Sequence, residues 1–254
     1  DALLAAGIAP WITLFHWDYP QALQQRGGWL APDAPAWFAE YAAFAVRRWG
    51  DRVAHWITLN EPEVFVMLGH RWGTHAPGEK LTQAQTLALA HRVLLAHGAA
   101  VRAMRASAPR PIAIGYAAAL TPALPASADP RDVDAARRRT FTGMAAWLLD
   151  PVYRGHYPAA ERREWGADVP EIGADDLAAI AQPLDFCAAN VYHGYRVRAG
   201  EGAATVPVPW PPGHPRTAFD AFMWAPEALH WGPRFLYERY RLPVVVTENG
   251  ISVT

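Results

Sequence analysis

Five short apolar segments, each followed by a helical pattern or a loop, constrain the fold of this chain more than any other feature. They are predicted to be strands, at residues 11–18, 55–62, 111–116, 184–192 and 243–247. Strands that alternate with helices form a mainly parallel sheet, because the connection between two parallel strands must cross back over the sheet. The sequence therefore predicts an α/β fold.

Local signals predict helices and loops between these strands. Asp33 is expected to cap a helix that ends at Gly50. Thr82 and Gln85 form a capping box for a long helix that runs to about Ser107. The remaining predictions are one helix over residues 131–149 stopped by Asp150-Pro151, a long loop over 194–216, and short helices that begin at Pro226 and Pro233.

Most of the predicted strands end in polar or ionisable residues. These are His16 and Asp18, Asn60 and Glu61, Asn190 and Tyr192, and Glu248 and Asn249. A (β/α)8 TIM barrel collects its catalytic groups at the carboxyl ends of its strands in this way. The alternative, a doubly wound sheet, more often carries a glycine-rich phosphate loop, and no such motif is present. The pattern favours the barrel.

Both ends of the sequence suggest part of a longer protein. Residues 1–7 are typical of the last turns of a helix closed by Gly7, with nothing upstream to begin it. Residues 244–250 are a buried strand and turn close to the last residue, and so apolar a strand needs neighbours on both sides. The prediction is a single incomplete (β/α)8 catalytic domain over residues 1–254. Because its sheet edges would be open, we expect this chain alone to be insoluble or oligomeric, and inactive.

Composition excludes several classes of protein. With 52% hydrophobic residues and a formal net charge of −1, the chain matches neither a disordered protein nor a basic nucleic-acid binder. No apolar run reaches the roughly 18 residues that cross a bilayer, and no signal peptide is visible. Cys187 is the only cysteine and cannot form an internal disulfide. These features predict a cytoplasmic protein without nucleic-acid or membrane partners.

Glu61 and Glu248 each end an apolar strand and precede a turn. In a barrel both would face one pocket. Hydrolysis of an acetal needs such a pair: one carboxylic acid protonates the leaving oxygen, and one carboxylate attacks or directs water. A single glutamate at a strand end is more often merely exposed. Asn60 before Glu61 and Asn249 after Glu248 weaken that interpretation.

The two glutamates lie in motifs that resemble a known family. The motifs are Thr58-Leu59-Asn60-Glu61-Pro62 and Val246-Thr247-Glu248-Asn249-Gly250, accompanied by further matching segments at residues 14–20, 75–78, 147–158 and 190–192. Together, and in this order along the chain, they resemble glycoside hydrolase family 1, the β-glucosidase type. The resemblance implies that the five strands are the third to the seventh of an eight-stranded barrel.

The resemblance also implies roles for single residues. Glu61 would be the acid/base and Glu248 the nucleophile of a retaining double displacement. Four more side chains would contact the sugar or the nucleophile: Asn60 the 2-hydroxyl, His16 and Trp17 the glycone hydroxyls, and Tyr192 the carboxylate of Glu248. The implied substrate is a β-linked oligosaccharide or an aryl or alkyl β-glycoside with a terminal β-D-glucosyl or related residue.

Several positions leave questions open. Glu63 stands where the family often has an aromatic residue on the aglycone side, and Phe222 stands where another is common but is equally compatible with a core position. Barrel strands one, two and eight, which carry the residues that read the 3-, 4- and 6-hydroxyls, are not matched, so glucose, galactose and fucose are not distinguished. Neither the aglycone preference nor the oligomeric state is predicted.

Other residues receive structural interpretations. His91 and His97 are interpreted as packing and surface residues of one helix, and the sequence contains no H-E-x-x-H motif, so no metal and no cofactor are predicted. Asp18 is expected to hold a turn, and Cys187 to be a small core residue.

Two alternatives to a retaining β-glycosidase remain. One is a catalytically inactive sugar-binding relative, which would normally lack one of the two glutamates. The other is an inverting barrel hydrolase, whose carboxylates would lie roughly 6.5–9.5 Å apart instead of about 5–5.5 Å.

Overall fold

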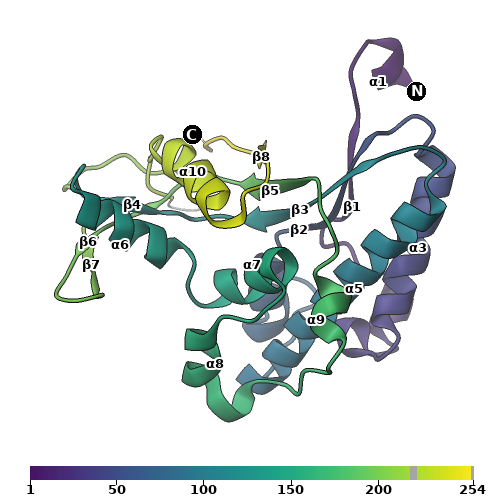
Figure 1. Cartoon of the computed structure of the whole chain (residues 1–254), viewed down its shortest axis with the longest axis horizontal. Coiled ribbons are helices and arrows are strands. Elements are labelled where there is room, and N and C mark those ends of the chain that lie inside the picture. Colours follow the sequence, from purple (N-terminus) through teal and green to yellow (C-terminus); the bar gives the residue numbers. More distant parts are fainter. Residues whose placement is uncertain (218–221, 253–254) are drawn as a thin grey trace.

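A parallel sheet of five strands forms the centre of the molecule (Figure 1). The computed structural model describes residues 1–217 and 222–252. The strands are β1 (Trp11–Phe15), β2 (His55–Asn60), β3 (Ala113–Ala119), β5 (Phe186–Asn190) and β8 (Val244–Glu248). They pair in chain order, and every pair is parallel. The predicted α/β fold is confirmed.

The order of the strands separates the two predicted architectures. A doubly wound sheet reverses its strand order at a switch point, whereas a barrel adds each new strand beside the previous one. Here each strand lies beside its predecessor in the order β1-β2-β3-β5-β8, and among the described residues the sheet does not close. The fold is therefore a partial (β/α)8 barrel.

Burial differs between the centre and the edges of this sheet. Every residue of β5 is buried, and β2 is buried except at His55, as expected for apolar strands in the middle of a parallel sheet. The outer strands β1 and β8 are more open: Trp11 is 42% exposed and Val246 is 39% exposed. Exposed apolar edges of this kind recruit other chains. They support the expectation of an insoluble or oligomeric chain, which stays a prediction.

Two long helices cover one side of the sheet. Figure 1 shows α3 (Ala34–Trp49) lying along α5 (Gln83–Ser107). The predicted capping box of α5 is confirmed, because Thr82 Oγ1 accepts from the Gln85 amide at 3.3 Å and Gln85 Oε1 accepts from the Thr82 amide at 2.9 Å. Asp33 and Gly50 stand at the N-cap and C-cap of α3, as predicted, but the Asp33 side chain accepts no hydrogen bond from the helix.

The predicted helix over residues 131–149 is two helices, α6 (Pro130–Thr140) and α7 (Met144–Arg154). The break falls at Gly143, whose φ of 63° lies in the left-handed region that glycine tolerates. Its amide donates to Glu161 Oε1 at 2.8 Å, so a side chain satisfies the amide at the start of α7. Helix α7 also continues through Pro151, which the sequence predicts as a stop.

The predicted loop over residues 194–216 contains a hairpin, which corrects that prediction. Strand β6 (Tyr195–Ala199) pairs antiparallel with β7 (Thr205–Val208) and parallel with β4 (Ala123–Pro125), giving a second sheet of three strands. The glycine and proline residues of this stretch favour a loop prediction, although β7 itself is rich in β-branched residues.

One helix, α10 (Ala228–Tyr240), replaces the two short helices predicted at Pro226 and Pro233. Pro233 lies inside α10, and Pro226 lies in the turn that precedes it, where its carbonyl accepts from the Leu229 amide at 3.1 Å.

The remaining elements are short. They are α1 (Ala2–Ala5), α2 (Gln21–Gln24), η1 (Gly28–Leu30), α4 (Pro62–Val64), the π-helical η2 (Phe65–Arg71), α8 (Ala159–Trp165), η3 (Gly166–Asp168) and α9 (Asp176–Ile180). No helix in the described part of the chain combines the length and the hydropathy that a membrane span requires.

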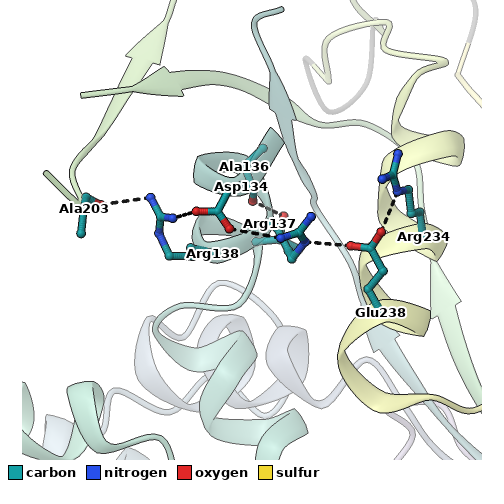
Figure 2. Close-up of polar contacts among 8 residues, drawn as sticks. Asp134, Ala136, Arg137, Arg138, Ala203, Arg234 and Glu238 are labelled. Atoms are coloured by element: carbon teal, nitrogen blue, oxygen red, sulfur yellow. Dashed lines mark hydrogen bonds and ion pairs between the residues drawn. The ribbon is translucent and has the colours of Figure 1, made fainter. Parts of the chain in front are cut away.

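Two ionic contacts attach α10 to its neighbours. Figure 2 shows the outer one, in which Arg137 of α6 bridges Asp134 at 3.1 Å and Glu238 at 2.7 Å. The inner one is buried: Arg239 donates to both oxygens of Asp150, at 2.9 and 2.5 Å, and Asp150 is 1% exposed. Removing one partner of a buried bidentate pair costs far more than removing one partner of a solvated pair, because the charge left behind cannot be solvated there.

The free energy of unfolding should differ between variants that break the buried pair and variants that break the solvated pair. In the full-length protein, Arg239→Leu is expected to lower the free energy of unfolding by roughly 3 kcal/mol, the low end of the range for losing one partner of a buried pair, because the Tyr240 hydroxyl still donates to Asp150. Arg137→Ala, the control at the more solvated pair, should cost less than about 1 kcal/mol. Urea unfolding monitored by tryptophan fluorescence measures both, and equal losses would contradict this account.

Candidate active site

A cavity of about 920 Å³ opens at the carboxyl ends of the strands. His16 and Trp17 follow β1, Glu61 follows β2, Tyr192 follows β5, and Glu248 ends β8; all of them line this cavity. Asn60 is buried and is absent from the described lining residues, but its side chain contacts two residues that line the cavity, His16 and Asn190. The sheet thus brings the predicted site residues together at one rim, with Asn60 in the layer beneath the cavity surface.

Glu61 is held in an unusual backbone conformation. Its φ of 46° and ψ of 59° are left-handed, where a residue with a side chain is costly by about 1–3 kcal/mol. The Glu61 amide donates to the Ala117 carbonyl of β3 at 2.8 Å, and Pro62 then begins α4. Trp17, with a φ of 80°, has the same kind of backbone at the end of β1. Both strained positions carry predicted site residues.

The environment of Glu61 favours its protonated form. Burial is the main cause that raises the pKa of Glu61, and the negative charge of Glu248 raises it further. A hydrogen bond from Asn190 and the neighbouring His16 act in the opposite direction. Because the net shift is upward, Glu61 keeps its proton to a higher pH than an exposed glutamate, as a general acid requires.

Glu248 has a more polar environment. Its side chain is 33% exposed, and the Tyr192 hydroxyl donates to its Oε2. His16 Nε2 lies 4.0 Å from its Oε1. A hydrogen bond from a hydroxyl fixes the direction of the carboxylate oxygens. The two carboxyl groups of this cavity therefore have different surroundings.

Asn190 connects the strand ends and was missed as a site residue by the sequence analysis. Its side-chain amide donates to Asn60 Oδ1 at 3.1 Å and to Glu61 Oε1 at 2.8 Å. Its carbonyl oxygen accepts from Thr247 Oγ1 at 2.7 Å. One buried side chain thus joins β2, β5 and β8. Its place at the end of an apolar strand, like that of Asn60, was the available signal.

Trp17 and His16 both contact Asn60. The Trp17 indole N–H donates to the Asn60 carbonyl at 3.0 Å, and the Asn60 amide nitrogen lies 3.1 Å from His16 Nε2. The indole of Trp17 has a single N–H, and that N–H is already bonded to Asn60. In this geometry the side chain can therefore offer a sugar its ring face but not a hydrogen-bond donor.

The other residues singled out in the sequence fall into three groups. Phe222 is a cavity residue that stacks on His193, with ring centroids 4.0 Å apart. Glu63 is absent from the described lining, and its carboxyl contacts β3 instead. His91 and His97 are both buried, so the interpretation as partly a surface pair is wrong; burial lowers the pKa of His97 to about 3.

Cys187 is 1% exposed, as predicted for a core residue, and burial raises the pKa of its thiol to about 12. Within residues 1–217 and 222–252, no group of three or more histidine, cysteine, aspartate or glutamate side chains is arranged to hold a metal ion.

Comparison with known proteins adds the family. Residues 1–254 match the family model described as glycosyl hydrolase family 1. The chain belongs to this family. Among curated relatives, it is 36% identical over 253 residues to beta-glucosidase A of Thermotoga maritima, covering 99% of this chain and 56% of that protein. It is 39% identical over 256 residues to a beta-glucosidase of an Agrobacterium species, covering 98% and 55%.

Solved structures agree with the sequence relatives. The beta-glucosidase from Thermotoga maritima in complex with glucoimidazole has a TM-score of 0.83 and 35% identity, and the match covers 99% of this chain and 56% of that one. The chain therefore spans a little more than half the length of these relatives.

The pH dependence of catalysis should reveal the Asn190 contact. In the full-length protein, Asn190→Ala removes a hydrogen bond that favours ionised Glu61, so the pKa of Glu61 should rise. The basic limb of the kcat/KM profile should then move to higher pH. Thr247→Val is the control, because it removes a bond to Asn190 without touching Glu61. A basic limb that stays in place, or moves down, in Asn190→Ala would refute this assignment.

Proposed function

We propose that the protein containing this chain is a retaining β-glycosidase that hydrolyses terminal β-D-glucosyl or related β-glycosyl residues. The observation that carries the proposal is the pair Glu61 and Glu248, which line one cavity in different environments. The relatives named beta-glucosidase support the same substrate class. The expected substrates are β-linked oligosaccharides and aryl or alkyl β-glycosides.

In the first step, the ionised Glu248 attacks the anomeric carbon and Glu61 transfers its proton to the glycosidic oxygen. The bond to the leaving group breaks, the alcohol departs with the Glu61 proton, and a glycosyl ester forms on Glu248. The Tyr192 hydroxyl, which donates to Glu248, is proposed to keep this carboxylate ionised and directed at the sugar.

In the second step, Glu61 acts as a base instead of an acid. The ester on Glu248 carries no charge, so one of the causes that raise the pKa of Glu61 disappears. Glu61, ionised after the first step, accepts a proton from water, and the water oxygen attacks the anomeric carbon. Glu248 leaves as a carboxylate, and the product keeps the β configuration.

The neighbouring polar residues are proposed to bind the sugar. His16 and Trp17 line the cavity and would contact the glycone hydroxyls, Trp17 through its ring. Asn60 is proposed to donate to the 2-hydroxyl; one of its amide hydrogens faces His16, which leaves the other available. Its buried position means that the sugar must approach closely or that His16 must turn aside.

Two further elements of the proposal concern the whole protein. A cytoplasmic location is supported by a single cysteine that is buried as a thiol. The alternative of an inactive sugar-binding relative has less support, because both glutamates are present and line the same cavity.

Azide rescue tests the role of Glu248. In the full-length protein, Glu248→Gly should abolish turnover of an aryl β-glucoside, since no nucleophile remains. Added azide fits the space of the lost carboxylate and should restore part of the activity by attacking the same face, so the product should be the α-glycosyl azide. Product analysis by NMR decides the matter: a β-glycosyl azide would mean that the two glutamates have exchanged roles.

A further inference from the structure

The turn that carries Glu61 is bonded to β3 on both sides. The Glu61 amide donates to the Ala117 carbonyl at 2.8 Å, and the Ala119 amide donates to Glu63 Oε2 at 3.1 Å. Ala117 and Ala119 are alternate residues of one strand edge, and Glu61 and Glu63 flank Pro62. The two bonds therefore enclose the position from which the Glu61 side chain enters the cavity.

Such anchoring matters because the turn has little support of its own. Glu61 lies in the left-handed region, and helix α4 consists of only three residues, with no side-chain cap at its start. A strained backbone persists only where the surroundings determine it. Of these two hydrogen bonds to β3, the bond that Glu63 accepts is made by a side chain. A substitution can therefore remove it.

The carboxyl of Glu63 has an unusual environment for an acidic residue. The residue as a whole is half-buried, but its Oε1 is buried and has no hydrogen-bond partner. Burial raises the pKa of Glu63 to about 8. At neutral pH the group is therefore protonated, and it accepts from Ala119 without placing another negative charge beside Glu61. A side chain serving only to pack would not need a buried carboxyl here.

We propose that Glu63 is a positioning residue for the acid/base: its hydrogen bond from β3 holds the turn of Glu61 in the orientation that protonates the glycosidic oxygen. The inference rests on the proposed function, since it assigns Glu63 a part in the proton transfer of Glu61. It also accounts for the absence of Glu63 from the described cavity lining, because its carboxyl points to β3 and not toward the aglycone.

Leaving-group dependence tests this role in the full-length protein. A 2,4-dinitrophenyl β-glucoside needs no protonation to react, whereas a phenyl β-glucoside does. Glu63→Met removes the acceptor at similar size and should lower kcat/KM for the phenyl substrate at least about tenfold more than for the dinitrophenyl substrate, a part of the roughly 10²–10⁴-fold that general acid catalysis contributes. Glu61→Ala gives the full loss for comparison.

Two further variants separate positioning from stability. Glu63→Gln keeps an oxygen for Ala119 and mimics the neutral acid, so its ratio of the two substrates should stay within about threefold of the unsubstituted protein, a small part of a general-acid effect. Glu161→Met is the matched control: Glu161 is buried and, like Glu63, accepts a hydrogen bond from a backbone amide, that of Gly143 at 2.8 Å, but it is not among the described residues that line the cavity. It should lower Tm and leave the ratio unchanged.

The outcomes are distinct. Equal losses on both substrates in Glu63→Met, or a Glu63→Gln variant as impaired as Glu63→Met, would overturn the positioning role while leaving the proposed function intact. If Glu63→Met does not fold, Glu63→Asp, which is one methylene shorter and draws the carboxyl back from Ala119, should shift the ratio in the same direction. No turnover of either substrate by the unsubstituted protein would instead refute the proposed function, and this inference with it.

Discussion

The rest of the site depends on the hydrogen bonds made by the side chain of Asn190. It donates to Asn60 and to Glu61 and accepts from Thr247, so it joins the ends of three strands through one buried amide. Because the strands are parallel and pair in chain order, their carboxyl ends meet at one rim, and a residue there can bond to both sides. The position of Glu61 follows from the sheet itself.

The same rim gives the two carboxyl groups different chemistry. Glu61 is buried near a second negative charge, and these causes raise its pKa, while Glu248 is partly exposed and accepts from Tyr192. Two carboxylates with different surroundings can divide the roles of acid and nucleophile. The backbone contributes as well, since Glu61 and Trp17 both occupy left-handed conformations that the neighbouring strands must maintain.

Much of this arrangement could be predicted from the sequence, because it depends on local pattern. Apolar runs that end in Asn60-Glu61 or Glu248-Asn249 mark both the strands and the rim, and Thr82 with Gln85 marks the start of α5. The break at Gly143 was missed although a glycine inside a helical pattern is a local signal for one. The continuation of α10 through Pro233 runs against local propensity, which favours proline at the start of a helix. Asn190 and Asn60 are 130 residues apart, so no local pattern predicts their contact.

The central claim is that Glu61 and Glu248 together perform a double displacement with retention of configuration. Proton NMR of the first sugar released from a β-glucoside by the full-length protein tests it most directly, because the anomeric signals of the two products are resolved before mutarotation mixes them. The account predicts that the β-anomer appears first and the α-anomer only later. An α-anomer formed first would show a single displacement by water and would contradict the assignment of Glu248 as nucleophile.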